Sequence, residues 1–237
     1  IYLWDNNQFR EAELYFEKAV NVNPKSLVAV YRLARNHHKL QNYEDMLELY
    51  EKLLRGDPEN MTYQIQYCEL LINLQDYEKA EIQIKKLEDK SDSNKYPDLE
   101  IRKLTMLASC ALKAKRLQIS EDYCTMALIA KPEYLPALVT HARIAHNMGN
   151  YFLAEQRWKL VLKQKPSHYS AIMGIARADF KKGNFIEGET ILKKLINDDS
   201  HNHRIWPYIE LINLTFNHLK DYEYTARICK LLFQNLG

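Results

Sequence analysis

The sequence contains few of the residues that interrupt regular structure. Of its 237 residues, only six are glycine and seven are proline. Linkers and disordered segments are normally rich in these residues, so the composition leaves little room for either. Hydrophobic residues make up 46% of the chain, which is enough for a folded, packed structure.

Long apolar runs and cysteine pairs are also scarce. No apolar run approaches the roughly 18 residues that a membrane-spanning helix requires, so no membrane span is expected. The four cysteines are interpreted as small hydrophobic residues in a reducing compartment, and not as a disulfide framework. A cytoplasmic location is therefore predicted. The chain has no signal peptide, but it does not begin with methionine, so this absence decides little.

Recognisable catalytic motifs are missing as well. The sequence has no glycine-rich phosphate loop, no His-Glu-x-x-His and no Gly-x-Ser-x-Gly. His141 and His146 are five positions apart, about 140° around a helix, so they cannot share a metal ion. We therefore expect no enzymatic activity, no cofactor and no metal site.

The charges are distributed unevenly along the chain. The net charge is +2, but residues 1–100 contain 13 Lys and Arg against 19 Asp and Glu, whereas residues 101–237 contain 20 against 12. An anionic partner would prefer the second half. The alternative is that these charges lie on the solvated outer faces of helices.

What the sequence does contain is a repeat. An aromatic residue returns mostly in steps of 34 residues, or a multiple plus a small insertion, at Phe9, Tyr43, Tyr77, Tyr151, Phe185 and Tyr222. A column of small or soft residues follows three positions later, at Ala12, Met46, Ala80, Ala154, Gly188 and Thr225. Another small-residue column precedes most of the aromatics, at Ala34, Cys68, Ala108, Ala142 and Ala176. Small residues allow two helix backbones to approach closely.

Prolines separate several of these units. Pro24, Pro58, Pro132 and Pro166 each remove a backbone donor and disfavour helix in the residue before them. Together with the columns, they make the sequence resemble the tetratricopeptide repeat, in which two antiparallel helices form each 34-residue unit. The resemblance extends over essentially the whole chain. It implies an all-α fold, a right-handed superhelical solenoid of about thirteen helices.

The period divides the chain into one array spanning 1–237. The units are a partial repeat 1–26 and the repeats 27–60, 61–100, 101–134, 135–168, 169–202 and 203–237. An enlarged loop is predicted at 88–97, and the first helix of the last unit is predicted to be longer than the others. Both ends are expected to be cut from a longer protein. Because Ile228 to Phe233 lack a polar capping helix, self-association is also predicted.

The resemblance also indicates where a partner would bind, since in this family the first helix of each unit lines the concave groove. Residues at i, i+4 and i+7 or i+8 share one face of a helix. On this basis the candidate partner-binding residues are Tyr31, Arg35, Lys39, Ile65, Lys113, Arg143, His146, Met173, Arg177, Phe180 and Lys181.

Arginine recurs in one column of this surface, at Arg35, Arg143 and Arg177. Arginine pairs bidentately with carboxylates, and apolar residues lie beside it, so the predicted ligand is a short acidic segment with hydrophobic anchors. The alternative is that these arginines pair with Glu or Asp on a neighbouring helix. The chaperone-tail clamp of the family is not matched, because Tyr31 and Arg35 occupy its leading columns.

The leading hypothesis is therefore a non-enzymatic protein–protein interaction scaffold, acting in signalling or assembly. A nucleic-acid-binding surface on the basic second half is the first alternative, although no base-reading code repeats from unit to unit. A regulatory domain of an enzyme that lies outside this sequence is the second.

Overall fold

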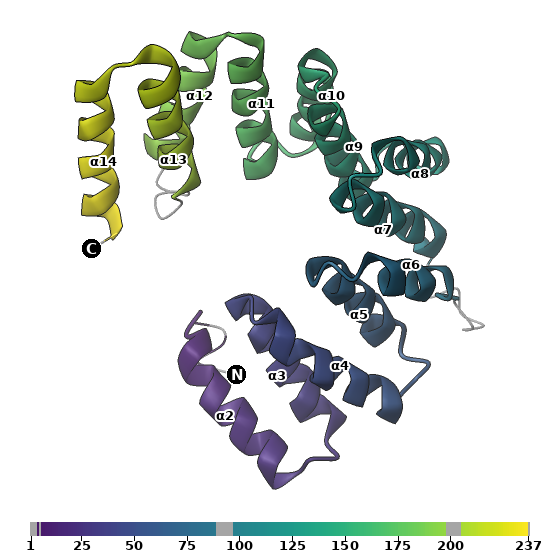
Figure 1. The fold of residues 1–237 in the computed structure, drawn as a ribbon. Coiled ribbons are helices and arrows are strands. Elements are labelled where there is room, and N and C mark those ends of the chain that lie inside the picture. Colours follow the sequence, from purple (N-terminus) through teal and green to yellow (C-terminus); the bar gives the residue numbers. More distant parts are fainter. Residues whose placement is uncertain (1–3, 5, 89–96, 198–204, 237) are drawn as a thin grey trace. The chain divides into compact units, whose positions relative to one another are not determined.

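The computed structural model describes residues 4, 6–88, 97–197 and 205–236. These residues form 13 α-helices, one π-helical turn and no strand (Figure 1). The prediction of an all-α helical-repeat fold is confirmed. The chain divides into two compact units, residues 1–123 and 124–237, and each is described by itself. The right-handed superhelical course stays a prediction.

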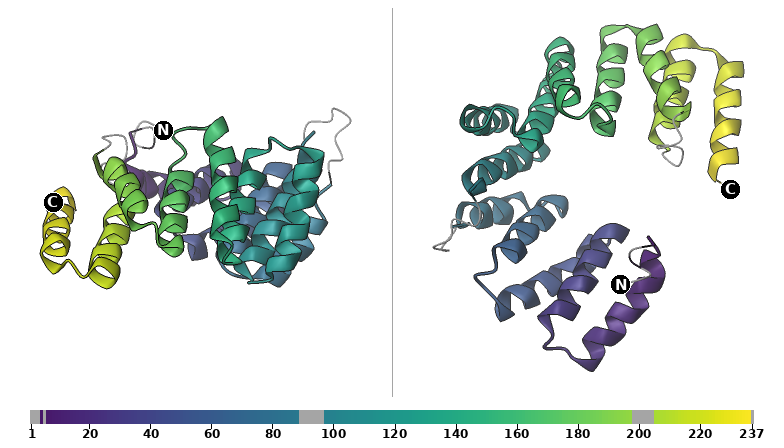
Figure 2. Two further views of the ribbon diagram at one scale, coloured as in Figure 1. Left: turned by 90° about the horizontal axis from the view of Figure 1, so that it is seen from above. Right: turned by 180° about the vertical axis from the view of Figure 1, so that it is seen from behind.

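The helices follow one another with short connections. In the first unit they are α2 (Phe9–Val22), α3 (Leu27–Leu40), α4 (Tyr43–Gly56), α5 (Met61–Asn73), α6 (Tyr77–Lys85) and α7 (Leu99–Lys113). The division between the units falls inside α8 (Leu117–Ala130). The second unit continues with α9 (Leu135–Asn147), α10 (Tyr151–Gln164), α11 (Tyr169–Lys182), α12 (Phe185–Asn197), α13 (Trp206–Asn213), the π-helical turn η2 (Leu214–Leu219) and α14 (Tyr222–Leu236). Within each unit, neighbouring helices run in opposite directions (Figure 2).

A left-handed residue closes the first helix of each repeat. These residues have positive φ angles and lie two positions before the start of the next helix, at Asn7, Gln41, Gln75, Lys115, Gly149, Gly183 and Lys220. The left-handed conformation ends a helix while its backbone N–H still bonds to the last turn, as Gln41 does to the carbonyl oxygens of His37 and His38. The chain then reverses and the second helix begins.

The small-residue columns lie in the contacts between helices. Six of their seven alanines are fully buried, at Ala34, Ala80, Ala108, Ala142, Ala154 and Ala176, and Ala12 is only 3% exposed. In the repeat that includes Ser120, the serine hydroxyl donates a 2.6 Å hydrogen bond to the carbonyl of Ala108, which also requires close approach of two helices. The small columns therefore set the helix spacing, as the sequence indicated.

The last repeat corrects one expectation. Its first helix is not longer: α13 has 8 residues and η2 has 6, which together match the 14 residues of α11. The additional residues fall between α12 and α13, where 198–204 lie outside the described residues. The π-helical turn instead places Thr215 against Thr225, with 2.8 Å between their buried hydroxyl oxygens.

Two further expectations concern the loop at 88–97 and the absence of a membrane span. Most of the enlarged loop at 88–97 lies outside the described residues, because positions 89–96 are not described. No helix in the described part of the chain combines the length and apolar character needed to cross a bilayer.

Candidate functional site

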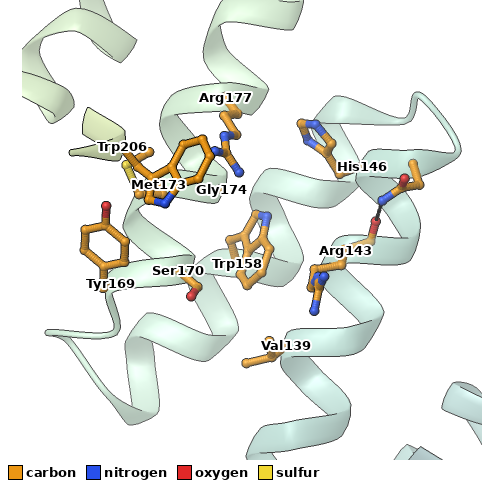
Figure 3. A pocket seen from close by; sticks show the side chains of 11 residues that line it. Val139, Arg143, His146, Trp158, Tyr169, Ser170, Met173, Gly174, Arg177 and Trp206 are labelled. Carbon is orange, nitrogen blue, oxygen red and sulfur yellow. Dashed lines mark hydrogen bonds between the residues drawn. The ribbon is translucent and has the colours of Figure 1, made fainter. Parts of the chain in front are cut away.

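A pocket of about 520 Å³ opens on the second unit, between α9, α10, α11 and the start of α13 (Figure 3). It is lined by Val139, Arg143, His146, Asn147, Trp158, Tyr169, Ser170, Met173, Gly174, Arg177 and Trp206. The successive first helices α9, α11 and α13 supply most of these residues, and the second helix α10 supplies only Trp158. The repeat architecture thus brings together side chains that are more than 60 positions apart in the sequence.

The lining combines positive charge with aromatic surface. Arg143 and Arg177 are both present, and none of the lining residues is a carboxylate. Tyr169 and Trp206 add aromatic surface, and the Trp206 side chain is 59% exposed. Such a pocket favours an anionic group that has an apolar or flat group next to it.

Trp158 and Gly174 form the closely packed base of the pocket. Trp158 is only 3% exposed, and a Cβ atom added to Gly174 would lie 2.3 Å from its Cε2 atom. Glycine is therefore required at position 174 for the indole ring to lie where it does. The Trp158 Nε1 atom is buried and has no hydrogen-bond partner among the described residues, which is unusual for an indole donor.

The two arginines of the pocket differ in their partners. The Arg177 Nε atom lies 2.7 Å from Oε1 of Glu210 on α13, so this arginine forms an ion pair with a neighbouring helix. Arg143 is exposed, and its guanidinium forms no ion pair within the described parts of the chain. Of the two interpretations left open by the sequence, pairing with a neighbouring helix thus applies to Arg177 and not to Arg143.

His146 lines the pocket without adding charge at neutral pH. Burial lowers the pKa of its imidazole, and the positive charges of Arg177 and Lys181 lower it further, while Glu210 acts in the opposite direction. The ring packs edge-on against Tyr151, with 5.3 Å between the ring centroids. Because the pKa is below its ordinary value, the imidazole is neutral at pH 7 and the positive charge of this pocket comes from the arginines.

The remaining candidate residues of the second unit lie close to this pocket. Met173 is 3% exposed and lines it directly. Phe180 and Lys181 line a neighbouring pocket of about 320 Å³, together with His146, Arg177 and Glu210. The structure therefore gathers all six candidates of this unit on two adjoining pockets.

The candidates of the first unit form separate, smaller pockets. Tyr31 and Arg35 line one of about 310 Å³, in which the Arg35 guanidinium lies 4.8 Å from the centroid of the Trp4 ring. Arg35 and Lys39 line another of about 220 Å³, which also includes Glu69.

Two other candidates of this unit make contacts within the fold and line none of these pockets. Ile65 is 2% exposed and belongs to the hydrophobic core, so it stabilises the fold and offers no contact surface. Lys113 is exposed, and its Nζ atom donates a 2.9 Å hydrogen bond to Oδ1 of Asn73. Neither residue adds to the pockets described above.

Sequence reasoning missed Tyr169 and Trp206. They are the first residues of α11 and α13, so an aromatic at the start of a first helix was the signal that could have found them. Trp158 is not among the predicted groove residues either, because it lies on the second helix α10 and its ring reaches the pocket from there.

Comparison with known proteins agrees with this architecture. A family model described as "Tetratricopeptide repeat" matches residues 1–61. The tetratricopeptide-repeat resemblance is confirmed. Comparison with curated proteins gives no match.

Solved structures extend this tetratricopeptide-repeat fold over the chain. PilW, a type IV pilus biogenesis factor, is 17% identical, with 85% of this chain and 92% of PilW covered and a TM-score of 0.64. A tetratricopeptide repeat protein from Parabacteroides merdae is 16% identical, with 98% and 94% covered and a TM-score of 0.61. Human IFIT1, solved as a dimer with m7Gppp-AAAA, is 12% identical with a TM-score of 0.73. The alignment covers 95% of this chain and 54% of IFIT1. At these identities the likeness shows the fold alone.

Proposed function

We propose that this tetratricopeptide-repeat array is a non-enzymatic interaction scaffold that binds a short acidic segment of a partner protein. The observation that carries the proposal is Arg143, an arginine without an ion-pair partner in the described chain, beside a pocket that contains no carboxylate. A cytoplasmic location is part of the proposal. It is supported by the cysteines, which are all free, with Cys68, Cys110 and Cys124 buried as in proteins of reducing compartments.

The proposed binding mode has a charged and an apolar part. A carboxylate of the partner pairs with the Arg143 guanidinium, which presents a planar fork of donors. A neighbouring apolar side chain of the partner lies against the exposed ring of Trp206, which lines the same pocket. The volume of about 520 Å³ lies within the range of about 300–1,000 Å³ that is usual for ligand pockets.

Replacement of Arg143 by glutamine tests the proposal. We expect the variant to bind an acidic peptide about tenfold more weakly, since truncating an interface arginine often costs about 2 kcal/mol or more and this one is partly solvated. The probe is a glycine–serine octapeptide that carries one aspartate next to one leucine, titrated into labelled protein and followed by NMR. In a second titration, the same peptide with asparagine in place of aspartate should bind the wild-type protein no more tightly than the aspartate peptide binds Arg143→Gln.

The matched control is Lys163→Gln, which removes an exposed charge on α10 that does not line the pocket. The affinity of this variant for the peptide should stay within about twofold of the wild-type value, because salt screens a single exposed charge outside the pocket. Equal losses in the Arg143 and Lys163 variants would mean that only the net charge matters, and would contradict the proposed site.

Nucleic acid is the second candidate partner. IFIT1 was solved with m7Gppp-AAAA, and the pocket of this chain combines arginines with aromatic rings that could stack on bases. The pocket contains only two arginines, one of them already paired, which favours the acidic peptide. Tight binding of single-stranded oligoadenylate that falls steeply with salt and is lost in Arg143→Gln would reverse this preference.

We also propose that α14 mediates self-association. It exposes Leu231 and Phe233, whose side chains are 50% and 73% accessible. Changing both to glutamate should shift the protein from concentration-dependent association to a monomer in sedimentation equilibrium, because the apolar contact is lost. Lys230→Glu on the same helix is the charge control and should leave association in place. A wild-type protein that is monomeric at high concentration would rule the proposal out.

A further inference from the structure

Ion pairs link successive first helices of the array in both units. Arg177 of α11 pairs with Glu210 of α13 at 2.7 Å, and Glu69 of α5 pairs with Arg102 of α7 at 3.0 Å. In both cases the partners are 33 positions apart, about one repeat. A residue late in one first helix thus reaches a residue early in the next.

The positions of the residues within their helices show how the Arg177 and Arg143 repeats differ. Arg177 is the ninth residue of α11, and Glu210 is the fifth residue of α13. Arg143 is likewise the ninth residue of α9, but the fifth residue of α11 is Met173. The arginine column is therefore the same in both repeats, and only the residue that follows it in the next helix differs.

This difference explains why one arginine is paired and the other is not. Where the following helix offers glutamate, the guanidinium binds it. Where the following helix offers methionine, it has no carboxylate at the corresponding position. The Arg177–Glu210 pair also displays how a carboxylate approaches an arginine of this column, through Nε at 2.7 Å.

The two arginines lie on a shared surface. Arg177 and His146 line both the pocket that contains Arg143 and the neighbouring pocket that contains Glu210. The side chains of Arg177 and Glu210 remain 43% and 23% exposed, so an external carboxylate can reach the pair. Glu210 nevertheless competes as a tethered group, at an effective concentration of about millimolar, which a weak external ligand does not displace.

We propose that Glu210 acts as an internal carboxylate ligand that occupies Arg177 and limits this surface to one partner carboxylate, which binds at Arg143. Glu210 is then a specificity-determining residue: it selects an acidic segment with one carboxylate beside an apolar residue over one with two. This inference rests on the function proposed above, because it assumes that acidic segments bind at Arg143.

The test compares two peptides on one set of variants. The first is the octapeptide with one aspartate, and the second carries an additional aspartate two or three residues away. Wild-type protein should bind the two within about twofold of each other. In Glu210→Gln, the second peptide should bind about fivefold to tenfold more tightly than the first, because Arg177 is now free to accept its second carboxylate.

Two further variants separate this explanation from a general change in charge. Glu187→Gln removes an exposed carboxylate of α12 that lines neither pocket, and it should produce no such preference. Adding Arg177→Gln to Glu210→Gln should abolish the preference, because the coupling requires both partners. If Glu210→Gln lowers the thermal midpoint of the protein, Glu210→Met is used in its place. This variant copies the residue at position 173.

The outcomes distinguish the two proposals. If Arg143→Gln weakens binding but Glu210→Gln produces no preference for two carboxylates, or produces one that survives Arg177→Gln, the inference about Glu210 is wrong and the proposed function stands. If Arg143→Gln has no effect on either peptide, the proposed function fails and the inference fails with it.

Discussion

Replacing Gly174 with alanine is expected to destabilise the protein, although alanine is the better helix former. In a helix interior, alanine is favoured over glycine by about 1 kcal/mol. Here the added Cβ would lie 2.3 Å from Cε2 and 2.4 Å from Nε1 of Trp158, far inside van der Waals contact. Forcing extra volume into a packed contact costs about 1–3 kcal/mol, so we expect a net loss in urea-induced unfolding.

The sign of the effect should depend on residue 158. In a Trp158→Leu background the ring is gone, the methyl group has space, and Gly174→Ala should become neutral or stabilising by up to about 1 kcal/mol. Because Trp158 also forms the base of the pocket, Gly174→Ala should weaken peptide binding as well. A stabilising effect of Gly174→Ala in the wild-type background would show that the indole ring does not lie over this glycine.

The sequence predicted the repeat architecture because the physical cause of the fold is local and periodic. A small residue such as Ala34 or Ala142 is needed wherever two helix backbones meet, so it returns once in each unit and can be recognised without any long-range information. The left-handed turn is harder to recognise. Five of its seven positions are not glycine, and residues such as Gln41 or Lys115 give no composition signal.

The last repeat shows where periodic reasoning fails. Three additional residues precede Tyr222, and the sequence from Ile205 to Leu219 contains no loop signal, so the periodicity predicts that the insertion lengthens the helix. The structure contains a π-helical turn and a helix that begins at Trp206. A buried pair of threonine hydroxyls accompanies this turn, and such a contact between Thr215 and Thr225 has no periodic signature.

The sequence predicts which residues share the helix face at the candidate site, but not which of them pair with one another. Helical spacing placed Arg143 and Arg177 in the same column, and both line the pocket. Which of them is paired depends on one residue of the following helix, glutamate at 210 or methionine at 173, and on the exact start of that helix. The sequence assigns the three additional residues of the last repeat to its first helix, whereas they precede that helix. The register of α13 against α11, and with it the partner of Arg177, could therefore not be derived from the sequence.

The second large effect is expected for Ala154→Leu. Ala154 is fully buried on α10, in one hydrophobic cluster with Ala142 and Ala145 of α9, which are also fully buried. Three alanines in this contact leave no volume for a leucine side chain, so the two helices must separate or the side chain must adopt a strained rotamer. We expect a loss of about 1–3 kcal/mol, measured as a lower urea midpoint.

The matched control for Ala154→Leu is Gln156→Leu, which adds an apolar side chain to an exposed position of the same helix. Surface substitutions usually change stability by less than about 0.5 kcal/mol, so this midpoint should hardly move. The spacing of α9 and α10 also sets how far Arg143 lies from Trp158, because each helix contributes one of the two. Ala154→Leu should therefore weaken peptide binding even at temperatures where the variant is folded, and an unchanged midpoint would mean that residue 154 does not lie in the contact between α9 and α10.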